Sequence, residues 1–381
     1  MPISRRTLLG RLGAGAAAAL SAPRPAADSL RAAMGNALPD ATRSGEFIRL
    51  NRNENAYGPS AAVIAAIRDA SDGVRHYPDL AARALRRQIA DLHGVTPDHV
   101  VLGCGSGELL RAAVYAFAGP QKTLIAALPT FESVAVCAQR AGAELVGVPL
   151  RRDSSHDLSA MLARTSAATG LVYVCNPNNP TGSLTRRQDL DDFLRELPAT
   201  SVVLIDEAYH HYVGESSDYA SFLERPVDDT RVIVTRSFSK IHGLAGLRVG
   251  YAVAAPGTAR VLASHGLSDG VNVVAARAAS AALDDSEHVR MSVSRNTDDR
   301  QEFLNQAMAR MLRVDSVANF VMLPASRPAI EVVEHFRKHR ILVSGPVPAF
   351  EQNIRVSLGM PDDMREFWRV WDLLPGHKMA M

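Results

Sequence analysis

The chain has 381 residues, of which 47% are hydrophobic and 22% are charged, and its formal net charge is +2. At ~150 residues per domain this length allows two or three domains, and the composition is that of a globular protein with a large core. The sequence has neither a basic stripe with interleaved aromatic residues nor an apolar run of ~20 residues, so nucleic-acid binding and a membrane span are not expected.

The first residues are typical of an export signal. Arg5 and Arg6 form a twin-arginine pair, a weakly apolar stretch follows at 12–20, and small residues come next. Cleavage is expected near Ala22 or Ala27, and the twin-arginine route would export a folded protein to the periplasm. A basic tail without a signal function would instead leave the protein in the cytoplasm. We therefore set residues 1–44 aside as a signal and linker.

Residues 45–74 are predicted to form an N-terminal arm. The polar, turn-rich segment LNRNENAYGPS contains Tyr57 and leads into a predicted helix at 61–70. The loop VRHYPD follows and presents Tyr77 just before a proline. A second helix is predicted at 80–92, where apolar residues recur at helical spacing.

A glycine-rich loop, GCGSGE, joins a predicted strand at 98–102 to a predicted helix at 109–117. Glycines let the backbone approach an anion, and the free N–H groups of a helix start favour phosphate, with Ser106 and Gly107 as the best donors. A dinucleotide site would need an acidic residue after the next strand, which here ends in PTF. The loop favours a monophosphate, and a plain helix start with permissive glycines is the alternative.

The middle of the chain alternates between strands and helices. This alternation predicts an α/β fold with a mostly parallel, seven-stranded type of sheet sandwiched by helices, in a large domain at residues 75–256. Ligands bind outside the carboxyl ends of the strands in such sheets. Strands are predicted at 98–102, 123–127, 144–148, 170–175, 201–205 and 232–235, helices at 131–141 and 185–197, and an apolar run at 249–255 closes the series.

Two loops at the expected carboxyl ends carry specific chemistry. VCNPNNPTG places Asn179 before a proline, and IDEAY places Asp206 directly after a buried strand. A carboxylate at that depth is normally paired, and a protonated pyridine nitrogen is a suitable partner because the pair makes the ring a better electron sink. Asn179 and Tyr209 could then hydrogen-bond a ring hydroxyl. A helix N-cap is the alternative role for Asp206.

The segment RVIVTRSFSKIHGLAGLRVGY presents a lysine at the mouth of a buried strand. An amine held away from bulk water has a lowered pKa, so Lys240 would be neutral and nucleophilic, as a Schiff-base lysine must be. Ser237, Ser239 and Arg248 would supply hydrogen bonds and a fixed cation for a phosphate. A surface lysine on a loop is the alternative, because S-x-x-K alone is a weak motif.

No metal site is expected. Cys104, Cys137 and Cys175 are too far apart in the sequence for a CxxC site, and an odd number gives no complete disulfide framework. His210 and His211 are adjacent, so their side chains point in different directions.

Residues 257–381 are predicted to form a smaller α+β domain. Helices and short strands replace the regular alternation after Pro256. The helices are predicted at 259–267, 271–283, 287–312, 329–338 and 362–373, and the strands at 318–323, 341–343 and 354–358.

The motifs NPNNPTG, DEAY, SFSK and GLRVGY occur in this order and spacing. Together they resemble the class I/II aminotransferases of the fold-type-I pyridoxal-phosphate enzymes, over residues 46–373. LNRNENAYG, RHYPD and NIRVSLG are similar to segments of the histidinol-phosphate aminotransferase branch. The resemblance implies pyridoxal 5'-phosphate as cofactor and transfer of an amino group between an L-amino acid, or a histidinol-phosphate-like amine, and a 2-oxo acid.

The resemblance implies three catalytic residues. Lys240 would form the Schiff base and then carry the proton between substrate and cofactor. Asp206 would keep the pyridine nitrogen protonated. Tyr209, together with Asn179, would bind the ring hydroxyl.

The resemblance also implies the binding residues and a homodimer with a shared active site. Phe131 would stack on the ring, and Arg355 would take the substrate carboxylate with the bidentate geometry of a guanidinium. Tyr57 and Asn179 would contact the substrate. The phosphate ligands implied by the resemblance are Ser106, Gly107, Ser237, Arg248 and, from the partner subunit, Tyr77.

The sequence departs from the histidinol-phosphate branch at four positions. Ser344 stands where the branch has an arginine that grips the substrate phosphate, so a charge-assisted contact is lost. Ala56 replaces a proline, Cys104 stands where asparagine is frequent, and Phe131 where tyrosine is frequent. With the export signal, Ser344 favours an unphosphorylated amino acid, aromatic or bulky, as substrate.

Two other functions are compatible with the motifs. Relatives on this scaffold decarboxylate, cyclise or oxidise amino acids with the same cofactor residues, because the cofactor carries the chemistry. The fold also serves as an effector-binding domain in bacterial regulators, but those carry a helix-turn-helix module where this chain has the predicted signal.

Overall fold

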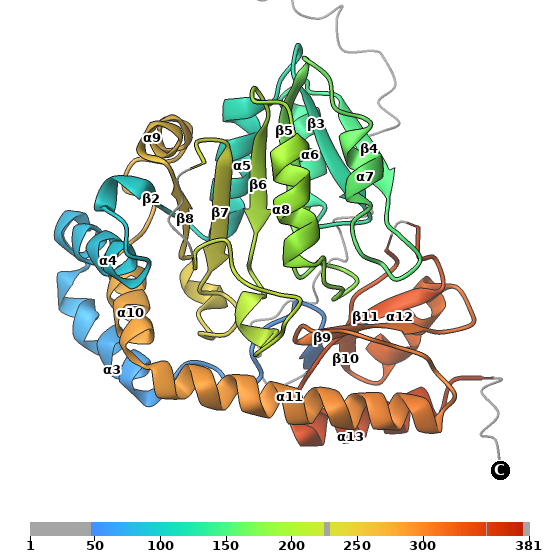
Figure 1. Cartoon of the computed structure of the whole chain (residues 1–381). Coiled ribbons are helices and arrows are strands. Elements are labelled where there is room, and N and C mark those ends of the chain that lie inside the picture. The colour runs from blue at the N-terminus through green and yellow to red at the C-terminus, as the bar shows by residue number, and fades with distance from the viewer. Residues whose placement is uncertain (1–46, 225–228, 348, 376–381) are drawn as a thin grey trace, which may run out of the picture. The chain divides into compact units, whose positions relative to one another are not determined.

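The computed structural model of the protein describes residues 47–224, 229–347 and 349–375 (Figure 1). The described residues from Ile48 onward belong to one compact unit. The export signal predicted at residues 1–44 lies outside the described part of the chain.

A seven-stranded sheet is the centre of this unit, in the order β2-β8-β7-β6-β5-β3-β4. β8 runs antiparallel to both of its neighbours and the other paired strands are parallel, which confirms the predicted fold class. The strands are β2 (Val100–Gly103), β3 (Thr123–Leu128), β4 (Leu145–Pro149), β5 (Thr169–Cys175), β6 (Val202–Asp206), β7 (Val232–Ser237) and β8 (Gly250–Ala254).

Successive residues of the central strands point to opposite faces of the sheet. Val203 and Val234 belong to the core on one face, whereas Leu204 and Ile233 belong to the core on the other. The first face is covered by α3 (Ala61–Asp69), α4 (Asp79–Leu92), α7 (Leu158–Leu162), α8 (Arg187–Glu196) and α10 (Val273–Asp284), and the second by α5 (Ser106–Phe117), α6 (Ser133–Arg140) and α9 (Pro256–Ser264).

A second core surrounds two short sheets. In one, β1 (Ile48–Leu50) pairs in parallel with β10 (Ile341–Val343), and in the other β9 (Phe320–Pro324) pairs antiparallel with β11 (Asn353–Ser357). The aromatic side chains of Phe336, Phe367 and Trp371 are buried there. The core is completed by α11 (Ser286–Ala309), α12 (Ala329–Lys338) and α13 (Pro361–Trp371).

The packing places the boundary between the two cores later than predicted. α9 and α10 pack on the seven-stranded sheet, so the second core begins with α11 and not at residue 257. The buried side chains of α10 are all alanine, which lets the helix lie close to its neighbours. Leu50, from the predicted N-terminal arm, is buried in the second core.

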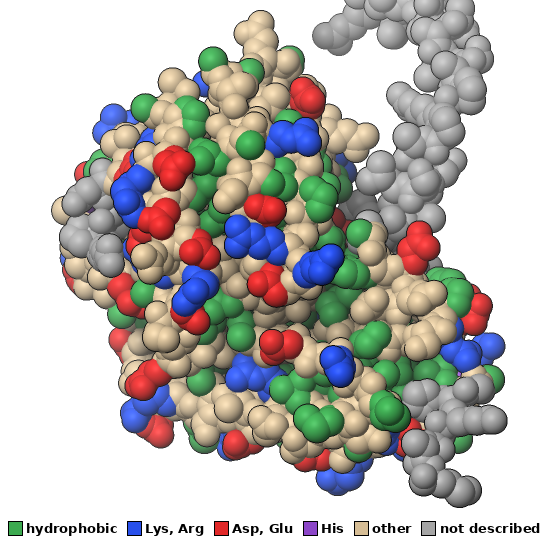
Figure 2. All heavy atoms as spheres, turned by 45° about the vertical axis from the view of Figure 1, so that its right-hand side comes forward, with side chains coloured by type: hydrophobic (Ala, Val, Ile, Leu, Met, Phe, Trp, Pro, Cys, Tyr) green, Lys and Arg blue, Asp and Glu red, His purple; other side chains and the backbone are tan. Residues whose placement is uncertain are grey.

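The described surface carries mixed charge. On the face that Figure 2 shows, Lys and Arg side chains are interspersed with Asp and Glu. Exposed pairs such as Arg186–Asp218, with 2.7 Å between Nη2 and Oδ1, contribute little stability because water screens them. None of the described helices is both long enough and apolar enough to cross a bilayer.

Candidate active site

Several predicted site residues meet at the carboxyl ends of β5, β6 and β7. Asp206 is the last residue of β6 and Ser237 is the last residue of β7. Asn179 lies in the loop that follows β5, and Lys240 lies in the loop that follows β7. This is the edge at which parallel α/β sheets bind ligands.

The amine of Lys240 is held by backbone carbonyls of the N-terminal segment. Its Nζ donates to the oxygens of Arg52 and Asn53, each at 3.1 Å, and lies 5.4 Å from the centre of the Tyr209 ring. Burial, together with the nearby Arg355 cation, lowers the pKa of Lys240 to about 8. Near neutral pH this amine therefore changes its protonation state readily.

The carboxylate of Asp206 is buried, with 3% of the residue exposed. It accepts hydrogen bonds from the Tyr173 hydroxyl at 3.1 Å, the Ala208 N–H at 3.2 Å and the Thr235 hydroxyl at 3.3 Å. Burial raises the pKa of Asp206 to about 6, although these hydrogen bonds act in the opposite direction. Asp206 caps no helix, because the short 3-10 helix that follows has Tyr209 at its N-cap.

Arg355, on β11, joins the second core to the site. Its Nη1 donates to Asn179 Oδ1, and its Nη2 donates to the carbonyl of Asn51 at 3.2 Å and to the hydroxyl of Ser344 at 3.3 Å. Its Nε is buried and has no hydrogen-bond partner within the described structure. Burial lowers the pKa of Arg355, so this guanidinium would gain from an added anion.

Asn53 is a central site residue that the sequence analysis missed. Its side-chain amide donates to the Tyr209 hydroxyl at 3.0 Å, which leaves the Tyr209 proton free to donate to another group. Its backbone carbonyl accepts from Lys240, and its N–H donates to the Ser357 hydroxyl at 2.7 Å. Its φ of +53° is one that asparagine adopts more easily than most residues, but no local pattern connects it to Lys240.

The predicted phosphate ligands gather at the start of α5. Ser106 is the first residue of the helix, and Gly105 before it has a φ of +77°. This φ is strained for any residue with a side chain, and a Cβ at Gly105 would also force the end of the flexible Arg248 side chain to move. Arg248 Nη1 donates to Ser239 Oγ at 3.2 Å, and the Ser239 N–H donates to Ser237 Oγ at 3.1 Å.

Three predicted residues lie outside this group. Tyr57 is turned toward α11, where its hydroxyl donates to Asp299 Oδ2 at 2.8 Å. Tyr77 is 82% exposed. Phe131 follows β3, so it lies near the edge formed by the carboxyl ends of the strands, and it is partly buried against the core on the α5 face.

These groups fit a ligand that has a phosphate at one end and a cationic ring nitrogen and a carbonyl carbon at the other. The helix start, the two serines and Arg248 suit the phosphate. Asp206 is a buried carboxylate without an ion pair of its own among the described residues, and it suits the ring cation. Lys240 supplies an amine for the carbonyl, and the unpartnered Nε of Arg355 indicates room for a further anion.

Comparisons with known proteins are consistent with this ligand. The model of the family described as aminotransferase class I and II matches residues 45–368. The chain is 38% identical to histidinol-phosphate aminotransferase 2 of Carboxydothermus hydrogenoformans, over 82% of this chain and 87% of that protein. It is 37% identical to an aromatic amino acid aminotransferase of Rhodococcus jostii, over 84% and 88%.

The fold is also similar to that of a solved aminotransferase structure. The histidinol-phosphate aminotransferase of Sinorhizobium meliloti, in complex with pyridoxal-5'-phosphate, superposes with a TM-score of 0.78. The identity is 28%, and the superposition covers 87% of this chain and 90% of that one.

Proposed function

The chain belongs to the class I and II aminotransferases, and from this membership we propose how its residues bind the cofactor and which substrates they select. It is a pyridoxal-phosphate-dependent transaminase. The bound cofactor supplies an electron sink that makes the α-proton of an amino acid acidic. The protein supplies attachment, orientation and proton transfer.

The cofactor phosphate would be held by the backbone of Ser106 and Gly107, the hydroxyl of Ser237 and the guanidinium of Arg248. The close approach of Arg248 Nη2 to Gly105, directly before the first residue of α5, supports this assignment, because it places a cation beside the free N–H groups of the helix start. Phe131 stacks on the ring from the loop after β3. A helix start and a fixed cation together bind a phosphate more tightly than either does alone.

Asp206 pairs with the ring nitrogen, and Tyr209 and Asn179 bind the ring hydroxyl. The burial of Asp206 supports its role, since a buried carboxylate gains more from a cation than an exposed one. Lys240 would attach the cofactor and, as a free amine, would carry the proton between the substrate and the cofactor. Its pKa of about 8 suits both directions near neutral pH.

Arg355 binds the α-carboxylate of the substrate. Its partners Asn179 Oδ1, Asn51 O and Ser344 Oγ are all neutral, so the cation is free to pair with an incoming carboxylate. Asn179 links this substrate contact to the cofactor. Tyr57 completes the substrate site only if its side chain leaves Asp299.

Ser344 is the observation that supports the proposed substrate class. Its backbone pairs with that of Arg355, with 3.0 Å from the Ser344 N–H to the Arg355 carbonyl, so it is a neighbour of the proposed carboxylate ligand. Serine offers no cation for a phosphate there. We infer that the amino donor is an unphosphorylated L-amino acid with an aromatic or bulky side chain, and that a 2-oxo acid is the acceptor.

The test is a comparison of donors with the purified enzyme. Single L-amino acids and histidinol phosphate are supplied with 2-oxoglutarate, and kcat/KM is measured for each. We expect aromatic or bulky amino acids to exceed histidinol phosphate by tenfold or more, since a charge-assisted contact amounts to about 1.5–3 kcal/mol. Turnover of histidinol phosphate above that of every amino acid would refute this assignment.

Two further proposals concern the whole protein. We propose a homodimer in which Tyr77 reaches the phosphate site of the partner, and the 82% exposure of this tyrosine supports it. We also propose export to the periplasm through the twin-arginine segment at residues 1–44. A reporter fused to residues 1–30 should leave the cytoplasm only when Arg5 and Arg6 are intact.

A further inference from the structure

A buried ion pair lies directly beside the cofactor residues. The Arg236 guanidinium donates to Glu207 Oε2 through Nε at 3.1 Å and through Nη2 at 3.0 Å. The two side chains are only 9% and 1% exposed. A pair this deep is expensive to desolvate, so it stabilises the fold only if its remaining hydrogen-bonding capacity is also filled.

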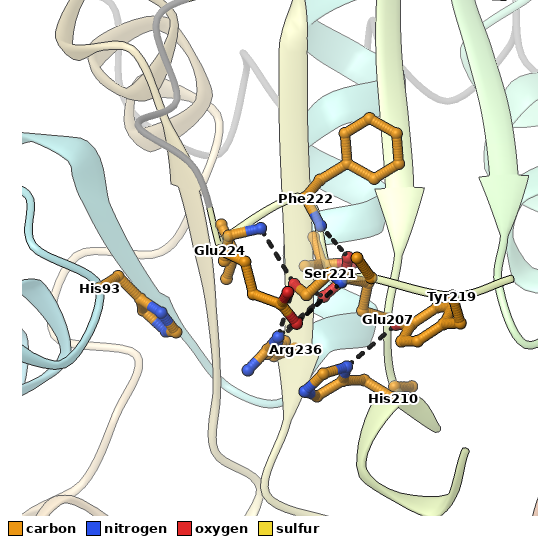
Figure 3. Close-up of polar contacts among 12 residues, drawn as sticks. His93, Glu207, His210, Tyr219, Ser221, Phe222, Glu224 and Arg236 are labelled. Atoms are coloured by element: carbon orange, nitrogen blue, oxygen red, sulfur yellow. Dashed lines mark hydrogen bonds and ion pairs between the residues drawn. The ribbon is translucent and has the colours of Figure 1, made fainter. Parts of the chain in front are cut away.

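The loop that contains Ser221 and Phe222 supplies the remaining hydrogen bonds of the ion pair. The Ser221 hydroxyl donates to Glu207 Oε2 at 2.7 Å and accepts from Arg236 Nη2 at 2.7 Å, so it touches both charges. The Phe222 N–H donates to Glu207 Oε1 at 2.9 Å. Figure 3 shows Ser221 at the point where the two charged groups meet, with Phe222 and Glu224 on the same loop.

Two histidine–tyrosine pairs also lie near the ion pair. His210 Nδ1 lies 3.0 Å from the Tyr219 hydroxyl, and His93 Nε2 lies 3.0 Å from the Tyr251 hydroxyl. Burial lowers the pKa of both histidines, to about 2 for His210 and about 4 for His93. Neither histidine therefore competes with Arg236 for Glu207 at neutral pH.

The position of the pair in the sheet connects it to the cofactor. Glu207 follows Asp206, and Arg236 precedes Ser237. β6 and β7 pair with Asp206 opposite Thr235, and the Thr235 hydroxyl donates to Asp206. Glu207 lies one residue past the end of β6, and its N–H continues the pairing by donating to the Thr235 carbonyl at 2.9 Å. Because side chains alternate between the faces of a sheet, we place the Glu207–Arg236 contact on the face opposite to Asp206–Thr235.

We propose that Glu207, Arg236 and Ser221 form a clamp that sets the register of β6 against β7 and thereby positions Asp206 and Ser237 for the cofactor. The three residues are positioning residues and touch no substrate. A slip of one residue between the strands would turn Asp206 to the wrong face. This inference rests on the proposed cofactor roles of Asp206 and Ser237.

The test separates positioning from plain stability. The double variant Glu207→Leu/Arg236→Met removes both charges together, so no unpaired charge remains, and such replacements often leave stability unchanged. Apo-enzyme is titrated with pyridoxal phosphate, and the dissociation constant is read from the visible absorbance. We expect a thermal midpoint close to that of the wild type and a dissociation constant raised about tenfold.

The matched control is Arg231→Met. Arg231 lies just before β7, at its other end, and donates to Asp229 Oδ2 at 2.7 Å and to the Leu194 carbonyl at 3.0 Å. This variant should lose thermal stability while keeping the wild-type dissociation constant. Should the double variant not fold, Ser221→Ala decides in its place, because it removes the hydroxyl that touches both charges and leaves the charges paired.

The clamp is wrong if the folded double variant binds pyridoxal phosphate as tightly as the wild type does. If the double variant does not fold, the clamp is wrong when Ser221→Ala binds as tightly as the wild type does. The proposed function has its own control in Asp206→Asn, which must weaken cofactor binding whatever the clamp does. If Asp206→Asn weakens binding and the clamp variant does not, only the clamp is wrong. If Asp206→Asn binds as the wild type does, the assignment of the site itself fails.

Discussion

At the scale of single residues, burial and a few hydrogen bonds give the site its chemistry. Lys240 and Asp206 are displaced from their ordinary pKa values in the directions that burial dictates, the amine downward and the carboxyl upward. Each therefore gains from a partner of the kind the cofactor provides. The sequence indicated both residues, because each follows a buried apolar strand.

Lys240 should make the apo-protein less stable at neutral pH. Its pKa falls from 10.5 to about 8 on folding, so the unfolded state binds more protons between these values and stability rises with pH across that window. We expect apo Lys240→Met to be more stable than the wild type at pH 7 by about 1–3 kcal/mol. Urea unfolding at pH 7 and pH 10 measures this, and a difference that does not shrink at pH 10 would contradict it.

Ser344→Arg should change the substrate preference. An arginine here would restore a cation beside the substrate site, and a charge-assisted contact with phosphate is worth about 1.5–3 kcal/mol. We expect kcat/KM for histidinol phosphate to rise tenfold or more and that for the best amino acid to fall or stay level. Ser344→Gln, of comparable length but neutral, is the control and should give no such rise.

At the scale of elements, the loops at the strand ends set the positions of the protein groups that are proposed to bind the cofactor. The composition of the glycine loop predicts the loop itself. The helix after it, predicted to start at residue 109, starts at Ser106. Gly105 can end the loop there only because it adopts a φ of +77°. Its contact with Arg248 spans more than a hundred residues of sequence, so no local pattern indicates it.

Gly105→Ala should damage the phosphate site. A backbone with φ +77° and ψ 160° is essentially restricted to glycine and costs another residue about 1–3 kcal/mol, and the added Cβ would also displace the end of the Arg248 side chain. We expect weaker binding of pyridoxal phosphate and a lower free energy of unfolding. Gly257→Ala, on α9 with nothing within 4 Å of the added Cβ, is the control and should neither weaken cofactor binding nor lower the free energy of unfolding.

At the scale of the whole molecule, the sequence predicted the central sheet better than the second core. Runs such as Val232-Ile233-Val234 mark buried parallel strands by composition alone. β1 is only three residues long and pairs with β10 near the other end of the chain, so it has no local signal. The buried side chains of α10 are all alanine and pack on the central sheet, a placement that their composition does not indicate.

The proposed homodimer should depend on the exposed apolar side chains next to Tyr77 in the sequence. Val74 is 64% exposed and Leu80 is 76% exposed, so with Tyr77 they present an apolar surface suited to a second copy. We expect the wild type to sediment as a dimer and Leu80→Glu to shift it toward monomers with weaker cofactor binding. Met308→Glu, at an exposed position on α11, is the control, and a fully active monomeric wild type would contradict the proposal.

The central claim is that Lys240 catalyses transamination of an unphosphorylated amino acid, and a half-reaction tests it most directly. The purified enzyme, loaded with pyridoxal phosphate, is mixed with one L-amino acid and no acceptor. We expect release of one 2-oxo acid per subunit by the wild type and no release by Lys240→Ala, because the proton transfer that precedes release needs the lysine amine. No 2-oxo acid from any amino acid, or equal release by Lys240→Ala, would contradict the claim.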